Sequence, residues 1–140
     1  MTKELTIYYK IFKSTSDCIN FLQKIKWEDN PKCPRCGSTK YSPVKGKFAY
    51  HCNFCNRTFT VTMQTLFHKS KIDLQKWFFA ISIMLKPKGN ITARELAEKI
   101  EVAKDTAWAV QKKIKIALIT SPQLILAIDK HLNDILCQTK

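Results

Sequence analysis

Four of the six cysteines are arranged in two closely spaced pairs, an arrangement that suits metal binding better than it suits isolated thiols. Cys33 and Cys36 form the first pair, and Cys52 and Cys55 form the second after an interval of fifteen residues. The resulting pattern, C-x2-C-x15-C-x2-C, is typical of a four-thiolate zinc site in which a hairpin brings the two pairs together. We therefore predict one structural Zn2+ bound by these four thiolates.

Two other chemistries are possible for paired cysteines. Disulfides require an oxidising compartment, and residues 1–6 contain no apolar export segment. A redox C-x-x-C motif requires a βαβ setting and a single motif, whereas this chain has a matched pair. His51 lies beside Cys52 and is an alternative ligand, but we expect it to be a ribbon side chain. We expect Cys18 and Cys137 to be semi-buried thiols.

The segment around the cysteines predicts a ribbon of three short antiparallel strands. The first begins near Tyr41, a turn covers residues 44–47, and the second strand ends at Cys52. Residues 57–63 alternate and are β-branched, so they predict the last strand, with Phe59 and Val61 on its apolar side. Gly37 permits the positive φ that follows a cysteine pair. A ribbon of about thirty residues buries too little apolar area to fold without its metal.

Helices are predicted on both sides of the ribbon. One covers residues 14–27, and a second covers residues 74–85 with Asp73 as its cap. Thr92 and Glu95 form a capping box that begins a third, and a fourth covers residues 104–119. The fold class is therefore α+β. We divide the chain into an N-terminal helix with its lead-in (residues 1–30), the zinc ribbon (31–66), a helix-turn-helix domain (67–120) and a C-terminal helix (121–140).

The two short helices joined through residues 101–103 predict a helix-turn-helix that places its last helix in the major groove. At 100° per residue, the side opposite the apolar stripe of that helix carries the candidate DNA-contacting residues Lys104, Asp105, Trp108, Lys112 and Lys115. A solvated face is the alternative for the charged residues, and packing against residues 74–85 is the alternative for Trp108. The amphipathic segment 123–137 either closes the core or forms a homodimer seam.

The charge distribution predicts a polyanionic partner. The formal net charge is +13, and no acidic residue occurs between Asp29 and Asp73. We predict that this interval holds double-stranded DNA through phosphate contacts from Lys40, Lys45, Lys47, Arg57, Lys69 and Lys71. Lysine supplies 21 of the 24 basic residues, which favours phosphate neutralisation over base readout because bidentate guanine recognition is mainly the work of arginine. A merely solvated surface is the alternative.

Other partners are not indicated. The longest run without a charged residue is 116–128, thirteen residues interrupted by Pro122, whereas a membrane-spanning helix needs about twenty. We expect a cytoplasmic, nucleoid-associated protein with no membrane contact and no small-molecule substrate.

Around the cysteines the chain contains Trp27, the sequence C-P-R-C-G-S at 33–38 and the sequence Y-H-C-N-F-C at 50–55, followed by Phe59 and Val61. This series resembles the zinc ribbon in the N-terminal region of bacterial insertion-sequence transposases. Residues 65–72, 76–78 and 106–108 are similar to that family's ribbon-to-helix connection and its helix-turn-helix. The resemblance covers about residues 12–118. It implies that the ribbon and helices grip the transposon ends.

The chain also departs from that family. The resemblance implies a later RNase H-like domain whose Asp-Asp-Glu carboxylates and Mg2+ cut and join DNA, but only about twenty residues follow the last predicted helix of the motif. They carry Asp129 and Asp134, too few for a two-metal site. We therefore expect no enzymatic activity, and we interpret residues 126–129 as a vestige of the first catalytic strand. Glu101 and Ala103 replace the glycine and capping hydroxyl usual in such turns.

Three alternatives to a transposon-end-binding protein are a zinc-ribbon transcription regulator, a protein-binding adapter and an enzyme. The adapter would dock through its ribbon, Trp108 and the last helix. The enzyme would be a nuclease completed by a partner chain or a thiol oxidoreductase.

Overall fold

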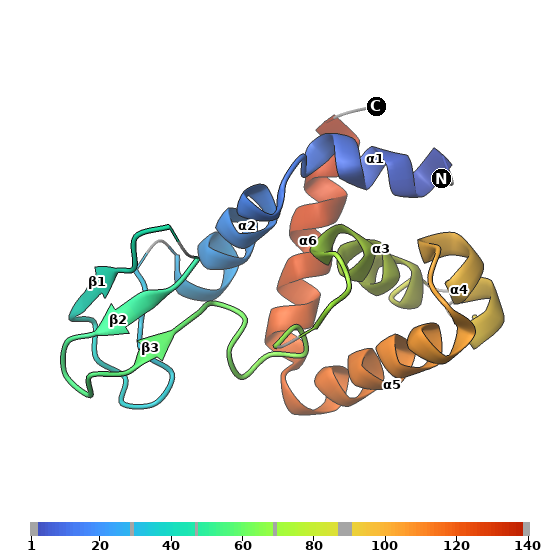
Figure 1. Ribbon diagram of the computed structural model, residues 1–140. Helices are drawn as coiled ribbons and strands as arrows, with labels where there is room; N and C mark the ends of the chain where they lie inside the picture. The colour runs from blue at the N-terminus through green and yellow to red at the C-terminus, as the bar shows by residue number, and fades with distance from the viewer. Residues whose placement is uncertain (1–2, 29, 47, 69, 87–90, 139–140) are drawn as a thin grey trace.

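The computed structural model describes residues 3–28, 30–46, 48–68, 70–86 and 91–138. A small sheet and a body of helices follow the order α1, α2, β1, β2, β3, α3, α4, α5, α6. Figure 1 shows the sheet at one end of the molecule, with α2 between it and the remaining helices. The predicted α+β class is confirmed.

The sheet is antiparallel, with β2 (Tyr50–Cys52) between β1 (Tyr41–Pro43) and β3 (Thr58–Phe59). Tyr41 lies opposite Cys52, and Tyr50 lies opposite Phe59. The predicted last strand, residues 57–63, is wrong in length because only two of its residues pair with β2. The carbonyls of Val61 and Met63 instead accept hydrogen bonds from Lys26 Nζ, each at 3.0 Å.

Helix α2 (Thr15–Trp27) attaches the sheet to the helices. Its predicted start is confirmed, since the Asp17 N–H donates to the Ser14 hydroxyl at 3.3 Å. At its other end, the Trp27 ring is buried, with its centroid 5.9 Å from that of Tyr50 and 5.7 Å from that of Phe59. This aromatic contact and the Lys26 hydrogen bonds fix the ribbon against the end of α2.

Helix α1 (Lys3–Ile11) was not predicted. It buries Leu5 and Tyr8, and the Tyr8 ring stacks on Phe79 of α3 (Leu74–Met84) at 5.0 Å between centroids. The predicted position of Asp73 at the N-terminal cap of α3 is confirmed, although its side chain makes no capping hydrogen bond. Asp73 occupies the cap position, but its carboxylate accepts a hydrogen bond at 2.6 Å from the Tyr9 hydroxyl, which joins α1 to α3.

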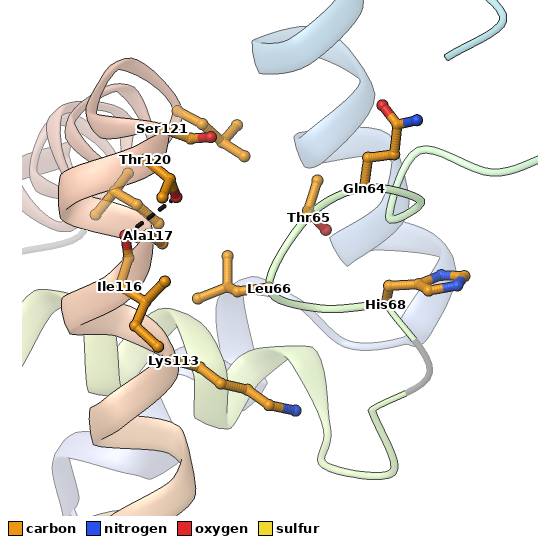
Figure 2. Close-up of a pocket in the computed structure, with 11 residues that line it drawn as sticks. Gln64, Thr65, Leu66, His68, Lys113, Ile116, Ala117, Thr120 and Ser121 are labelled. Atoms are coloured by element: carbon orange, nitrogen blue, oxygen red, sulfur yellow. Dashed lines mark hydrogen bonds between the residues drawn. The ribbon is translucent and has the colours of Figure 1, made fainter. Parts of the chain in front are cut away.

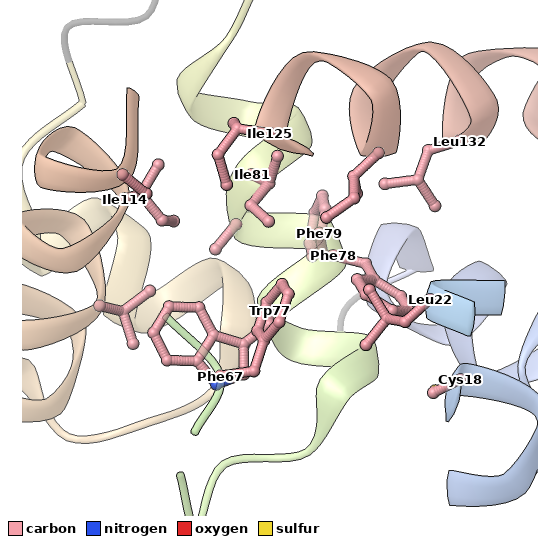
Figure 3. Packing of buried hydrophobic residues seen from close by; sticks show 14 of the residues in the cluster. Cys18, Leu22, Phe67, Trp77, Phe78, Phe79, Ile81, Ile114, Ile125 and Leu132 are labelled. Atoms are coloured by element: carbon pink, nitrogen blue, oxygen red, sulfur yellow. The ribbon is translucent and has the colours of Figure 1, made fainter. Parts of the chain in front are cut away.

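The core surrounds α3, which is buried on every side from Trp77 to Ile83. Figure 3 shows Trp77, Phe78 and Ile81 of this helix among side chains from its neighbours. Two polar groups in this region are paired: the Gln75 amide donates to the Phe12 carbonyl at 2.8 Å, and the Trp77 indole N–H donates to the Ser70 hydroxyl at 2.8 Å. The helix therefore shows no single apolar stripe, because other helices contact it all around.

Helix α6 (Pro122–Gln138) supplies buried Ile125, Ile128 and Leu132 to this core, and it packs against α2, α3 and α5. The alternative in which this segment closes the core is thus confirmed, while a homodimer stays a prediction. The interpretation of residues 126–129 as a vestigial strand is wrong, since they lie within α6.

Helices α4 (Ala93–Ile100) and α5 (Lys104–Thr120) meet at the predicted turn. The Glu95 N–H donates to the Thr92 hydroxyl at 3.1 Å, which confirms the predicted cap. Glu101 adopts φ 57°, and the N–H of the next residue, Val102, donates to the Ala97 carbonyl at 3.1 Å. Ala103 precedes α5 without a side-chain cap. Pro87 and Gly89, residue types that commonly end helices, follow α3 in the sequence and lie outside the described residues.

Candidate metal centre and nucleic-acid interface

The sulfur atoms of the four paired cysteines lie within 4.8 Å of one another. The Sγ atoms of Cys33 and Cys55 are 3.8 Å apart, and those of Cys36 and Cys52 are 3.5 Å apart. A tetrahedral zinc with Zn–S bonds of about 2.3 Å requires S···S separations of roughly 3.8 Å. The four thiolates therefore fit one structural zinc, as the spacing predicts.

The two cysteine pairs sit in loops with the same backbone hydrogen bonds. In the first, the Gly37 N–H donates to the Cys33 carbonyl at 2.9 Å, and the Cys33 N–H donates to the Ser38 carbonyl at 3.0 Å. In the second, Asn56 and Cys52 make the equivalent bonds at 2.9 and 2.8 Å. The role of Gly37 is confirmed, with φ 76°, and Asn56 has φ 59°. Asn56 was not predicted, although asparagine enters this region more readily than most residues.

Backbone N–H groups favour the ionised form of the sulfur that a metal requires. The Cys55 N–H donates to Cys52 Sγ at 3.4 Å. This hydrogen bond is the main reason that the pKa of the Cys52 thiol falls to about 6, against the opposing effect of desolvation. His51 lies in β2 but outside the sulfur cluster, as expected of a ribbon side chain.

The other two cysteines do not belong to this cluster. The expectation that both are semi-buried is wrong. Cys18 is fully buried in α2, in the core near Leu22 (Figure 3), whereas Cys137 is exposed on α6. The difference arises because α2 is enclosed by other elements on the side that carries Cys18, while the end of α6 is open to solvent.

Four of the predicted phosphate contacts are exposed: Lys40, Lys45 and Arg57 in the ribbon, and Lys71 in the segment that precedes α3. Lys47 and Lys69, the other two, lie outside the described residues. Arg35, a further cation of this interval, is partly engaged, since its guanidinium donates to the Thr58 carbonyl at 2.9 Å. The described cations are thus accessible to a polyanion, and their contacts with DNA stay a prediction.

The outer side of α5 exposes all five residues predicted to face the groove, namely Lys104, Asp105, Trp108, Lys112 and Lys115. The Trp108 side chain is 57% exposed, so the alternative in which it packs against α3 is wrong. Lys112 Nζ lies 5.0 Å from the centroid of the Trp108 ring, a cation–π contact between residues one turn apart. An exposed tryptophan beside lysines is available to a partner molecule.

None of the described helices combines the length and the apolar character that a membrane span requires.

Comparison with known proteins finds a match between the ribbon and a transposase domain. Residues 13–58 match the family model of the transposase zinc-ribbon domain. The chain is also 30% identical over 102 residues, or 71% of its length, to a protein of Halobacterium salinarum described as "Uncharacterized protein in transposable element ISH50". The match spans 34% of that relative's length. No solved structure matches the chain. The resemblance predicted for the ribbon is confirmed, since residues 13–58 match a transposase zinc-ribbon domain.

Proposed function

We propose that this protein binds double-stranded DNA at the ends of a mobile element. The proposal starts from residues 13–58, which match a transposase zinc-ribbon domain. The observation that carries the proposal is the coincidence of two cationic surfaces with this ribbon. One is the acid-free interval between Asp29 and Asp73, and the other is the exposed side of α5 with Lys104, Lys112 and Lys115. Their charges match the regular phosphates of a duplex.

In this proposal, α4 and α5 form a helix-turn-helix, with α5 as the helix that enters the major groove. Support comes from the tight turn at Glu101 and from the buried inner side of α5, which fixes its outer side toward solvent. Lys104 and Lys112 would contact phosphate, while Asp105 and Trp108 carry groups suited to base edges. A carboxylate accepts from the cytosine amino group, and an apolar ring contacts the thymine methyl group.

The ribbon supplies positioning and little sequence information. Its exposed cations Lys40, Lys45 and Arg57, together with Lys71 before α3, would hold the DNA backbone and fix the register of α5 on the duplex. The zinc stabilises these loops, because a module of about thirty residues cannot otherwise stay folded. DNA affinity should therefore depend on the metal without any contact between the metal and DNA.

Selection of bound duplexes from a random pool tests the proposal, with the zinc-loaded protein and its Lys104→Ala and Lys112→Ala variants. We expect a tight complex with the wild type, and we expect each substitution to lower affinity while leaving the preferred sequence unchanged. Lys10→Ala on α1 removes the same charge from an exposed site outside both surfaces, so it is the matched control. If no duplex is retained at moderate salt, the protein-binding adapter replaces this proposal.

A further inference from the structure

A groove lies between the segment that follows the ribbon and the corner where α5 meets α6 (Figure 2). We call residues 64–68 the joint. The groove has a volume of about 410 Å³. This is within the range of clefts that bind ligands, about 300–1,000 Å³. Among the described residues, no zinc ligand and no side chain named above as a DNA contact lines it.

The groove has an apolar floor and a cationic edge. Its apolar lining comes from both sides: Leu66, Ile116, Ala117, Leu124 and Ile125. Figure 2 shows Leu66 pointing from the joint toward α5, while Lys113 extends from α5 toward the joint. Ile116 is 49% exposed although it lines this apolar surface. An apolar side chain that enters the groove covers this exposed apolar area, and the removal of apolar area from water favours binding.

The groove also lies between two stretches of the chain that contain no acidic residue. The joint falls within residues 30–72, and the α5–α6 corner falls within residues 106–128; neither stretch contains Asp or Glu. No carboxylate lines the groove among the described residues. The ammonium group of Lys113 is therefore available to a negative group of an occupant.

This surface is separate from the side of α5 that the proposed function assigns to DNA. Lys113 directly follows Lys112, so the two side chains point about 100° apart around the helix axis. Lys113, Ile116 and Thr120 line the groove, whereas Lys104, Trp108 and Lys115 share the outer side. Lys112 lies at the edge of the outer side, one turn before Ile116, and does not line the groove. A duplex on the outer side leaves the groove open.

We infer that the groove binds an acidic, apolar segment of a partner protein, which places one or more apolar side chains on the floor and a carboxylate against Lys113. Charge complementarity selects this occupant. A second copy of the chain would bring another net charge of +13 to the same surface, and DNA offers phosphate where the floor is apolar. The protein thus has separate surfaces for DNA and for a protein.

Fluorescence anisotropy with the zinc-loaded full chain tests the inference. The probe is a labelled peptide with leucines flanked by glutamates, and its counterparts carry lysine in place of glutamate or serine in place of leucine. We expect only the acidic, leucine-containing peptide to bind. We expect Lys113→Glu to weaken that binding about tenfold, and Lys112→Glu by less than about twofold, because only Lys113 lines the groove.

Lys112→Glu is the matched control because both substitutions change the net charge equally on exposed residues of one helix. Duplex DNA titrated against the same variants should show the reverse order, so failure of the groove and failure of the proposed function are distinguishable. Equal weakening by the two substitutions, or equal binding of the serine peptide, would overturn the inference. So would self-association that Ile116→Glu abolishes, or DNA-induced shifts of backbone amides confined to the groove.

Discussion

Cys36 and Cys137 are both exposed thiols, yet only Cys36 lies within the sulfur cluster. We predict that Cys36→Ser lowers zinc affinity at least about 100-fold, because a neutral hydroxyl replaces one of four thiolates. Cys137→Ser should leave affinity unchanged. Competition with a chromophoric chelator measures both. Zinc retention by Cys36→Ser at wild-type affinity would show that this thiolate is not a ligand.

We predict that the Cys18 thiol is alkylated much more slowly than the Cys137 thiol. Burial raises the pKa of the Cys18 thiol to about 12, with smaller contributions from Asp17 and Asp73. At pH 8 only about one molecule in 10,000 then carries the Cys18 thiolate, the form that reacts with alkylating agents. Alkylation of the native protein by iodoacetamide, followed by peptide mass spectrometry, should modify Cys137 first.

The raised pKa of Cys18 also bears on how its alkylation depends on pH. Burial and a raised pKa both keep the Cys18 thiol unreactive in the folded protein, so Cys18 should react more slowly than Cys137 at each pH at which the fold is stable. Alkylation of Cys18 as fast as Cys137 in the folded, zinc-loaded protein would contradict its burial.

Individual residues show what spacing can and cannot predict. The cysteine spacing and Gly37 predict the metal loops because ligand geometry and backbone conformation are local properties. Asn56 plays the same part as Gly37, but asparagine occurs in many conformations, so its type alone does not reveal a positive φ. The Lys26 ammonium bonds to carbonyls 35 and 37 residues away, and no local pattern encodes that contact.

The turn between α4 and α5 carries a conformational cost at Glu101, whose φ is 57°. We predict that Glu101→Gly stabilises the protein by about 1 kcal/mol, because glycine enters this region without the steric penalty of a Cβ atom. The Glu101 carbonyl, which accepts from Lys76 Nζ at 3.0 Å, is retained in the variant. Urea denaturation of the zinc-loaded protein measures the change.

Glu98→Gly is the control for this substitution, since Glu98 is an exposed residue inside α4. There the same change should destabilise by about 1 kcal/mol, because a helix interior penalises the freedom of glycine. Destabilisation by both variants would mean that the Glu101 side chain contributes more than its backbone conformation costs.

Among the elements, those with a strong local signal were predicted. Ser14 and Thr92 mark helix starts, and alternation around Tyr50 and Phe59 marks paired strands. Helix α1 was missed because it is short, and its burial depends on the distant Phe79. The last strand was predicted too long because the carbonyls beyond Phe59 are bound by α2 instead of by β2. In both cases tertiary contacts outweigh local preference.

At the scale of the whole molecule, α2 and α3 connect the zinc ribbon to the helical body. The buried core extends from Leu5 in α1 to Leu132 in α6. The ribbon contacts this body through Trp27 and Lys26 of α2. Figure 1 shows α2 beside the sheet. The predicted domain boundaries at residues 30, 66 and 120 stay predictions. Contacts of α1 and α2 with α3 and α6 cross these boundaries.

Binding of the zinc-loaded protein to a labelled duplex over a range of salt concentrations tests the central claim most directly. If about six phosphates are neutralised, the logarithm of the association constant should fall against the logarithm of salt concentration with a slope near −5. Lys112→Ala should make that slope shallower by about one, while Lys10→Ala should leave it unchanged. A slope near zero would contradict DNA binding through these cationic surfaces.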